Sequence, residues 1–320
     1  MSDRRGDDLH MVDVSVLVPA KDEAENLPLF MEQAELAFAG SGARFEVIVV
    51  DDGSVDDTWR VLQELAGRYT FLRPVRHRTR RGIADALRTG YLHARGGVLV
   101  FYPADLQYLP EDIPRLVDPI LRGDADMVTG YKVGQYEKAA VSNIYNWLSR
   151  KLFNVRVRDL NSVKAYRREI MDILPLRPDW HRYMIVMAAA EGFSLAEVPV
   201  PLYPRHAGHS KFGIGRIPVG VLDMLSVWFE LRFGKKPLLL FGMAGAILFL
   251  IGLVTGVIAV GWRVIAGTGF RPLLTLIETC LILGSVFLAT GLLGEQIAVQ
   301  RAELREMRRQ LETLRSRRDG

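Results

Sequence analysis

The chain has 320 residues, of which 49% are hydrophobic, and its formal net charge is only +4 at pH 7. So mild a positive charge does not indicate a nucleic-acid partner, whereas the high apolar content indicates that part of the chain lies in a membrane. The single cysteine, Cys280, excludes an internal disulfide framework and is typical of a reducing compartment.

Strand and helix patterns alternate over residues 11–216, after a polar start at residues 1–10 that we expect to be disordered. We expect strands over 14–20, 45–50, 97–102 and 126–130, and helices over 27–39, 57–67, 82–94 and 111–122. The first strand, VSVLVPA, is almost wholly apolar, which is typical of a parallel sheet covered on both faces. This region therefore predicts an α/β domain, in which ligands bind beyond the carboxyl ends of the strands.

Acid-bearing loops follow three of the predicted strands. They are PAKDEAENL, DDGSVDDT and PADLQ, and they carry Asp22 and Glu23, Asp51 and Asp52, and Asp105 and Gln107, respectively. Each loop alone also has a structural explanation as a turn or a helix cap. Because parallel strands end at one sheet edge, the three together predict a ligand site. Such acids accept hydrogen bonds from a nucleoside or hold a divalent ion against a diphosphate.

The segment IPVGVLDMLSVWFELRF, residues 217–233, is mostly apolar with a narrow polar side. That polar side consists of Asp223, Ser226, Glu230 and Arg232. Together with Trp228 and Phe229, this pattern predicts a helix that lies in the membrane interface, within a juxtamembrane segment at residues 217–236.

Two long apolar runs at residues 237–294 predict two transmembrane helices. No residue from Pro237 to Trp262 is charged, and Glu278 is the one charge from Leu273 to Gly294. Both runs reach the roughly 20 residues that a span requires. A buried hairpin of a soluble protein is the alternative, but such helices need a polar face and the first run has none. Glu278 is either functional or reaches the interface.

Basic residues flank the two spans unequally. Arg232, Lys235 and Lys236 precede the first span, and Arg301, Arg305, Arg308, Arg309, Arg315, Arg317 and Arg318 follow the second, whereas the link between them has Arg263 and Arg271. The positive-inside tendency therefore predicts that the α/β domain and both termini are cytoplasmic, in a protein that we expect to cross the plasma membrane twice.

An amphipathic helix is predicted for residues 295–320. Its heptad positions, which alternate steps of three and four, are Ile297, Gln300, Leu304, Met307, Leu311 and Leu314, and all but Gln300 are apolar. This pattern favours self-association into a homo-oligomer or binding to anionic lipid, and a frayed charged tail is the alternative.

Several segments resemble glycosyltransferase family 2, whose fold is named GT-A. The resemblance is carried by VSVLVPAKDEAENL, VIVVDDGSVDDT, RRGIADALRTGYLHARGGVLVF, ADLQ, VRDLNSVKAYRRE (157–169) and YPRHAGHSKFGIGR (203–216). An α/β domain followed by an interfacial helix and two spans is similar to the polyprenyl-phosphate branch of that family, which includes dolichyl-phosphate mannose synthase. The resemblance covers about residues 13–296.

The resemblance implies roles for individual residues. The nucleotide sugar is expected at Pro19, Lys21, Glu23, Val50, Asp51, Asp52, Gly82, Ala104 and Asp105, and a divalent metal, Mg²⁺ or Mn²⁺, at Asp105 and Gln107. The lipid phosphate is expected at Lys138, Ser142, Arg205, Ser210 and Lys211. The expected catalytic set is Asp105, Lys132, Asp159, Arg205 and Lys211, with Asp159 as an orienting group or weak base.

Two positions depart from the family pattern. Pro103 replaces the first acid of the metal motif, so we expect weaker metal binding without loss of metal use. Val163 replaces the usual glycine after Ser162.

The resemblance implies an inverting transfer of a hexose-type sugar from a UDP- or GDP-sugar to undecaprenyl or dolichyl phosphate. Two other functions are considered. One is a non-catalytic membrane scaffold that binds sugar nucleotides, which the loss of the acid at Pro103 would permit. The other is a processive polysaccharide synthase, but the sequence has no Gln-x-x-Arg-Trp segment.

Overall fold

The computed structural model describes residues 12–133, 147–153, 155, 157–174, 180–206, 217–234, 236–267, 269 and 271–319. The expectations for residues 1–10 and for Lys138, Ser142, Ser210 and Lys211 lie outside these residues. The chain divides into two compact units, Met1–Val227 and Trp228–Gly320, and each is described by itself.

The first unit is built on one seven-stranded mixed sheet. In spatial order its strands are β3 (Leu72–Arg76), β2 (Phe45–Asp51), β1 (Val14–Ala20), β4 (Val98–Phe101), β6 (Lys164–Arg167), β5 (Met127–Val133) and β7 (Leu195–Pro201). Strand β6 is antiparallel to both of its neighbours, and all other pairs are parallel. Six strands therefore end, and β6 begins, at the same side of the sheet, which we name the carboxyl edge.

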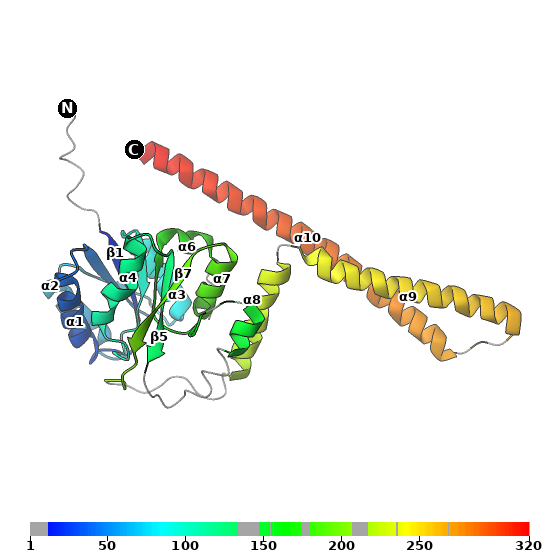
Figure 1. Cartoon of the computed structure of the whole chain (residues 1–320), viewed down its shortest axis with the longest axis horizontal. Coiled ribbons are helices and arrows are strands. Elements are labelled where there is room, and N and C mark those ends of the chain that lie inside the picture. The colour runs from blue at the N-terminus through cyan, green and yellow to red at the C-terminus, as the bar shows by residue number, and fades with distance from the viewer. Residues whose placement is uncertain are drawn as a thin grey trace. The chain divides into compact units, whose positions relative to one another are not determined.

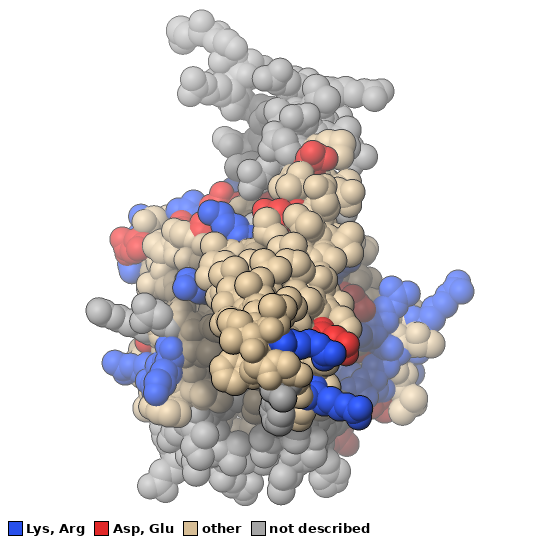
Figure 2. All heavy atoms as spheres, turned by 90° about the vertical axis from the view of Figure 1, so that its right-hand side faces the viewer, with Lys and Arg blue, Asp and Glu red and all other residues tan. Residues whose placement is uncertain are grey.

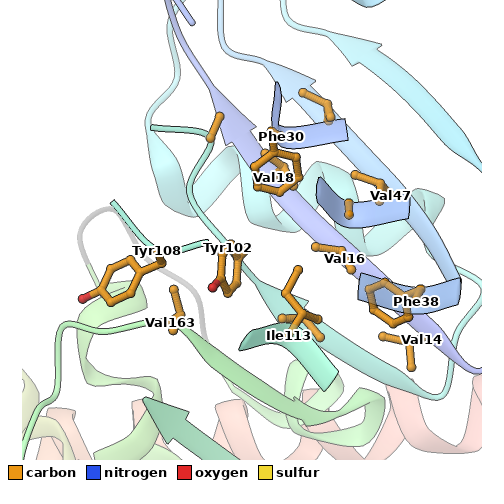
Figure 3. Packing of buried hydrophobic residues seen from close by; sticks show 14 of the residues in the cluster. Val14, Val16, Val18, Phe30, Phe38, Val47, Tyr102, Tyr108, Ile113 and Val163 are labelled. Carbon is orange, nitrogen blue, oxygen red and sulfur yellow. The ribbon is translucent and has the colours of Figure 1, made fainter. Parts of the chain in front are cut away.

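Helices cover both faces of this sheet (Figure 1). They are α1 (Leu27–Ala39), α2 (Thr58–Arg68), α3 (Ile83–His93), α4 (Ile113–Leu121), α6 (Arg168–Ile173) and α7 (Met184–Ala190), with short 3₁₀ turns η1 (Pro110–Asp112) and η2 (Trp180–Tyr183). Because side chains of a strand alternate between faces, Val14, Val16 and Val18 of β1 share one face. Figure 3 shows these valines with Phe30 and Phe38 of α1 and Ile113, which begins α4, all within one buried cluster.

The opposite face of β1 packs on α3. Gly90 of α3 permits this contact, because a Cβ at that position would lie 3.2 Å from Leu17 Cδ2. Leu17 of β1 is buried at this contact with α3. The sheet is thus a central layer between two helical layers, which holds its strand ends, and the loops that follow them, in fixed positions.

The predicted elements agree with the structure, but three strands, β3, β6 and β7, and two short helices, α6 and α7, were not predicted. The expected helix at 27–39 and strand at 14–20 have the observed bounds, and the other expected elements differ by a few residues. Strand β3 was missed because LRPVR contains a proline and two arginines, which its partly exposed position next to only one strand tolerates. Strand β6 has only four residues, KAYR, and β7 contains Pro199 and Pro201.

The division between the units falls within α8 (Ile217–Phe233), which matches the expected interfacial segment in extent. The second unit continues with α9 (Pro237–Ala266) and α10 (Arg271–Asp319). Both are long and apolar enough to cross a membrane, over Pro237–Ala266 and Arg271–Leu304. The predicted second span and the predicted C-terminal amphipathic helix form one continuous helix, α10.

Glycines allow α9 and α10 to pack closely side by side (Figure 1). A Cβ at Gly284 would lie 2.7 Å from the backbone nitrogen of Phe249, and one at Gly245 would lie 2.6 Å from that of Leu288. The outer surface of the pair that faces the viewer in Figure 2 is mostly free of charged side chains. Small residues that bring two backbones together are typical of helix pairs in membranes.

Candidate active site

The loops after β1 and β2 interlock at the carboxyl edge. Lys21 Nζ donates a hydrogen bond to the Gly53 carbonyl at 3.1 Å and pairs with Asp22 at 3.2 Å. The Asp22 N–H donates to Ser54 Oγ at 2.9 Å. Gly53 has φ +68°, and a Cβ there would lie 2.7 Å from the backbone nitrogen of Arg80, so this position requires glycine.

The remaining nucleoside candidates of these strands lie beside this junction. Pro19 and Val50 are register partners in β1 and β2. The Glu23 N–H donates to Thr58 Oγ1 at 2.8 Å, and the Glu23 carboxylate accepts a hydrogen bond from Asn26 Nδ2 at 2.6 Å. The four side chains Pro19, Lys21, Glu23 and Val50 thus come from two adjacent strand ends, as the sequence predicts.

Asp51 and Asp52 are buried and both are engaged by neighbouring groups. Asp51 Oδ1 accepts the Ser54 N–H at 2.8 Å, and Arg76 Nε lies 3.1 Å from Asp51 Oδ2. Asp52 accepts hydrogen bonds from His77 Nδ1 at 2.9 Å and from the N–H groups of Arg81 at 2.7 Å and Gly82 at 2.8 Å. Burial alone would raise the pKa of Asp52, but these hydrogen bonds outweigh it and lower the pKa.

Asp52 therefore anchors the glycine loop that begins α3. Gly82 precedes α3 with φ +97°, a conformation that favours glycine. His77 also contacts Thr89 Oγ1 of α3 through Nε2 at 2.9 Å, so it links the ends of β2 and β3 to that helix. His77 was not predicted as a site residue because β3, which precedes it, was not predicted.

Asp105, Gln107 and Arg205 form a second cluster at the carboxyl edge. Arg205 Nη2 lies 3.0 Å from Asp105 Oδ2, and Arg205 Nε donates to Gln107 Oε1 at 3.2 Å. The Tyr203 N–H donates to the Gln107 carbonyl at 2.9 Å, which fixes the loop after β7 against the loop after β4. Burial raises the pKa of Asp105, and Arg205 opposes that shift only in part.

The chemistry of this cluster fits a divalent cation. The oxygens of Asp105 and Gln107 are hard ligands, and the one guanidinium that bridges them shows that they converge on a single cation. Pro103 supplies no ligand, and Ala104 is buried beside Asp105. Within the described ranges there is no group of three or more His, Cys, Asp or Glu side chains that could hold a metal.

Lys132 and Asp159 form a third cluster. Lys132 Nζ lies 3.1 Å from Asp159 Oδ2, and the Asn161 N–H donates to Asp159 Oδ1 at 3.0 Å. Both charged side chains are largely buried. The antiparallel direction of β6 explains the pairing, because the segment before β6 meets the end of β5 at the carboxyl edge.

Lys164 lies under the third cluster and was not predicted. It is fully buried, and its Nζ donates to the carbonyls of Ser162 at 2.8 Å and Leu160 at 3.3 Å. Burial lowers its pKa to about 7, with Lys132 and Arg182 adding to the shift and Asp159 opposing it. Burial similarly lowers the pKa of His181 to about 3. A lysine at the start of a four-residue strand has no sequence pattern that marks it as buried.

The structure thus arranges the described candidates in three clusters at one edge of the sheet. The clusters are the β1–β2 junction with Asp52 and Gly82, the Asp105–Gln107–Arg205 group, and the Lys132–Asp159 pair. Lys138, Ser142, Ser210 and Lys211 lie outside the described residues.

Comparisons with known proteins relate the chain to sugar transferases. A family model described as glycosyl transferase family 2 matches residues 15–167. A dodecaprenyl-phosphate galacturonate synthase of Rhizobium johnstonii is 31% identical, over 91% of this chain and 89% of its own. An undecaprenyl-phosphate 4-deoxy-4-formamido-L-arabinose transferase of Klebsiella pneumoniae is 27% identical, over 89% of this chain and 88% of its own.

A solved structure supports the fold. Glucosyl-3-phosphoglycerate synthase from Mycobacterium tuberculosis, in complex with Mn²⁺, UDP and phosphoglyceric acid, superposes with a TM-score of 0.56 at 20% identity. The similarity covers 69% of this chain and 78% of that chain, and it establishes the GT-A architecture alone. The chain belongs to glycosyltransferase family 2 and is a membrane glycosyltransferase similar over most of its length to polyprenyl-phosphate sugar transferases.

Proposed function

We propose that this protein transfers a sugar from a nucleotide-diphosphate donor to the phosphate of a polyprenyl phosphate, at the cytoplasmic face of the plasma membrane. One observation carries the proposal: a chain with two helices of membrane-spanning length also has two ion pairs at the carboxyl edge of its sheet. These pairs are Arg205–Asp105 and Lys132–Asp159. The similarity to transferases named for dodecaprenyl and undecaprenyl phosphate extends over both features.

The donor nucleotide is proposed to bind across the ends of β1, β2 and β4. The residues proposed to contact it are Pro19, Lys21, Glu23, Val50, Asp51, Asp52, Gly82, Ala104 and Asp105. Ligand binding at this edge is general for open α/β sheets. In the described structure Asp52 already accepts three hydrogen bonds, so we expect it to act mainly by shaping the loop at Gly82.

The proposed reaction is a single displacement with inversion. A phosphate oxygen of the acceptor forms a bond to the anomeric carbon as the bond from that carbon to the diphosphate oxygen breaks, and the nucleoside diphosphate leaves with the electron pair. The acceptor phosphate is already an anion near neutral pH, so the reaction needs no strong general base. The main obstacle is repulsion between the anionic acceptor and the anionic leaving group.

Cationic side chains offset that repulsion. Lys132 and Arg205 each carry a positive charge at the carboxyl edge, where burial strengthens their interactions with phosphate oxygens. Asp159 is proposed to hold the ammonium group of Lys132 in place, as the distance of 3.1 Å supports. A divalent metal, Mg²⁺ or Mn²⁺, would be held by Asp105 and Gln107, and when bound it would neutralise charge on the leaving diphosphate.

The acceptor side of the proposal rests on the membrane segments. Lys138, Ser142, Arg205, Ser210 and Lys211 are proposed to contact the lipid phosphate, and α8 is proposed to lie in the membrane interface. The α/β domain and both termini are proposed to be cytoplasmic because most basic residues near the spans precede the first span or follow the second, and few lie in the link between them. Self-association through α9 and α10 is a further part of the proposal.

A transfer assay tests this function. The purified full chain is mixed with a short polyprenyl phosphate and a panel of labelled UDP- and GDP-sugars, with Mg²⁺, Mn²⁺ or chelator. We expect label from one donor to enter the lipid phase, and we expect Lys132→Met to reduce that transfer strongly. If no donor transfers label although a sugar nucleotide binds, the non-catalytic scaffold replaces the proposed enzyme.

A further inference from the structure

The side chain of Arg205 binds the same two side-chain oxygens, of Asp105 and Gln107, that fit a divalent metal. Its guanidinium reaches Asp105 Oδ2 at 3.0 Å through Nη2 and Gln107 Oε1 at 3.2 Å through Nε. Asp105 is 8% exposed, so its charge has little access to water and needs a cation beside it. Arg205 supplies that cation from the loop after β7.

Arg205 and a divalent ion cannot share this position. An ion bound to both oxygens at about 2.1 to 2.5 Å would occupy the space between them that the guanidinium now takes. Its positive charge would also repel the guanidinium at short range. Pro103 stands where the family has an acid, so Asp105 is the one carboxylate among Asp105, Gln107 and Arg205. Its single negative charge balances the guanidinium alone, but not the guanidinium together with a divalent ion.

The loop that carries Arg205 has an anchor that does not involve this side chain. The Tyr203 N–H donates to the Gln107 carbonyl at 2.9 Å through backbone atoms alone. The backbone of the loop is therefore held against the metal motif when the guanidinium leaves. The exchange of partners requires rotation of one long side chain, which is 26% exposed, and no rearrangement of the sheet.

We propose that Asp105 and Gln107 bind Arg205 and a divalent cation in turn, so that arrival of the metal with the donor diphosphate releases Arg205 toward the acceptor phosphate. This inference rests on the proposed function for its role in transfer. In this exchange Arg205 first binds Asp105 and Gln107 and then binds a phosphate oxygen. While Arg205 is bound there, it also balances the charge of the largely buried Asp105.

Binding of Mn²⁺ tests the exchange without turnover. The full chain in detergent is titrated with Mn²⁺, with and without UDP, and free Mn²⁺ is measured by electron paramagnetic resonance. We expect Arg205→Gln to bind Mn²⁺ about tenfold more tightly than the unmodified protein, because the competing charge-assisted hydrogen bonds are gone. Arg205→Lys, which keeps the charge but loses the two-pronged contact, should give a smaller increase.

Two further variants control the interpretation. Arg44→Gln removes a more exposed arginine–aspartate pair, in which Arg44 Nη2 lies 3.2 Å from Asp13 Oδ1 at the opposite edge of the sheet, and it should leave Mn²⁺ affinity unchanged. The double variant Asp105→Asn with Arg205→Gln should lose the gain. The exchange is wrong if Arg205→Gln binds Mn²⁺ no more tightly than the unmodified protein, or if neither protein binds it. It is also wrong if the double variant keeps the gain.

This outcome is separable from that of the transfer assay. If Mn²⁺ affinity rises in Arg205→Gln while no donor transfers label, the exchange at the metal motif stands and the proposed transfer function fails. If label is transferred but Mn²⁺ affinity does not respond to Arg205, the transfer function stands and the exchange fails.

Discussion

Lys164 is a fully buried lysine, and its charge opposes folding. Below about pH 7 it is protonated in both the folded and the unfolded chain, so the full cost of burying the charge is present. As the pH rises from about 7 toward the ordinary lysine value of 10.5, the folded chain loses this proton first. The unfolded chain then binds more protons, and the free energy of unfolding increases with pH.

Replacing Lys164 by Met removes this pH dependence. Between pH 7 and 9 we expect the free energy of unfolding of the unmodified protein to rise relative to that of Lys164→Met, by at most about 1.4 kcal/mol per pH unit. Thermal unfolding of the detergent-solubilised chain at several pH values measures the difference. Lys151→Met, a change at an exposed lysine of the same unit, is the control. Parallel pH profiles for the unmodified protein and Lys164→Met would show that burial does not shift this pKa.

The pair Lys132–Asp159 makes a prediction about catalysis. Asp159→Asn keeps an oxygen for the Asn161 N–H but removes the charge that holds Lys132 at 3.1 Å. We expect kcat for sugar transfer to fall by about tenfold to a hundredfold, as misplacement of a charged group by about 1 Å does.

A double-variant comparison separates positioning from direct action at Asp159. If Asp159 acts through Lys132, the variant that combines Asp159→Asn with Lys132→Met should be no slower than Lys132→Met alone. Losses that multiply would instead assign Asp159 an independent role as a weak base.

At the scale of elements, the apolar pattern predicted most of the inner strands and all of the longer helices, but it missed the edge strands and the short helices α6 and α7. Strands β1 and β2 are mostly apolar because helices cover both of their faces. Strands β3 and β7 lie at the two ends of the sheet and contain prolines, which an edge tolerates and a pattern search rejects.

Prediction of the candidate site was limited in the same way, to residues that follow strands with a clear apolar pattern. Asp52, Asp105 and Gln107 were predicted because they follow apolar strands, and the structure places them at the expected edge. The side-chain partners were not predictable, since they depend on elements distant in sequence. Arg205 lies far from Asp105 along the chain, and the antiparallel β6 that brings Asp159 to Lys132 has no pattern of its own.

The α9–α10 pair makes a prediction about packing. A Leu at Gly284 would place its Cβ 2.7 Å from the Phe249 nitrogen and 2.9 Å from the Gly245 carbonyl oxygen, both backbone atoms. We expect Gly284→Leu to separate the helices and to cost about 1 to 3 kcal/mol of stability, as overpacking does. The thermal midpoint of the detergent-solubilised chain reports this loss.

Gly261→Leu is the matched control for that change. Gly261 lies in α9, and a Cβ there would meet no atom within 4 Å. This variant should therefore unfold at nearly the same temperature as the unmodified protein. Equal losses from Gly284→Leu and Gly261→Leu would show that the two helices do not pack through their glycines.

At the scale of the whole molecule, the distribution of basic residues relative to the spans predicts orientation in the membrane. The link between α9 and α10 is flanked by Arg263 and Arg271, whereas many more arginines follow the second span. Translocation disfavours loops rich in Lys and Arg, so the link should lie outside the cell and the α/β domain in the cytoplasm. The proposed transfer requires this arrangement if the donor is drawn from the cytoplasmic pool.

Single cysteines test that orientation. Cys280 is the only native cysteine, and Cys280→Ala provides a background in which Gly269→Cys marks the link and Ser41→Cys marks an exposed position of the α/β domain. A membrane-impermeant maleimide should label Gly269→Cys in intact cells and Ser41→Cys only after permeabilisation. The reverse result would place the donor-binding edge outside the cell. Since that side lacks the cytoplasmic nucleotide sugars, it would contradict the proposed reaction as well as the orientation.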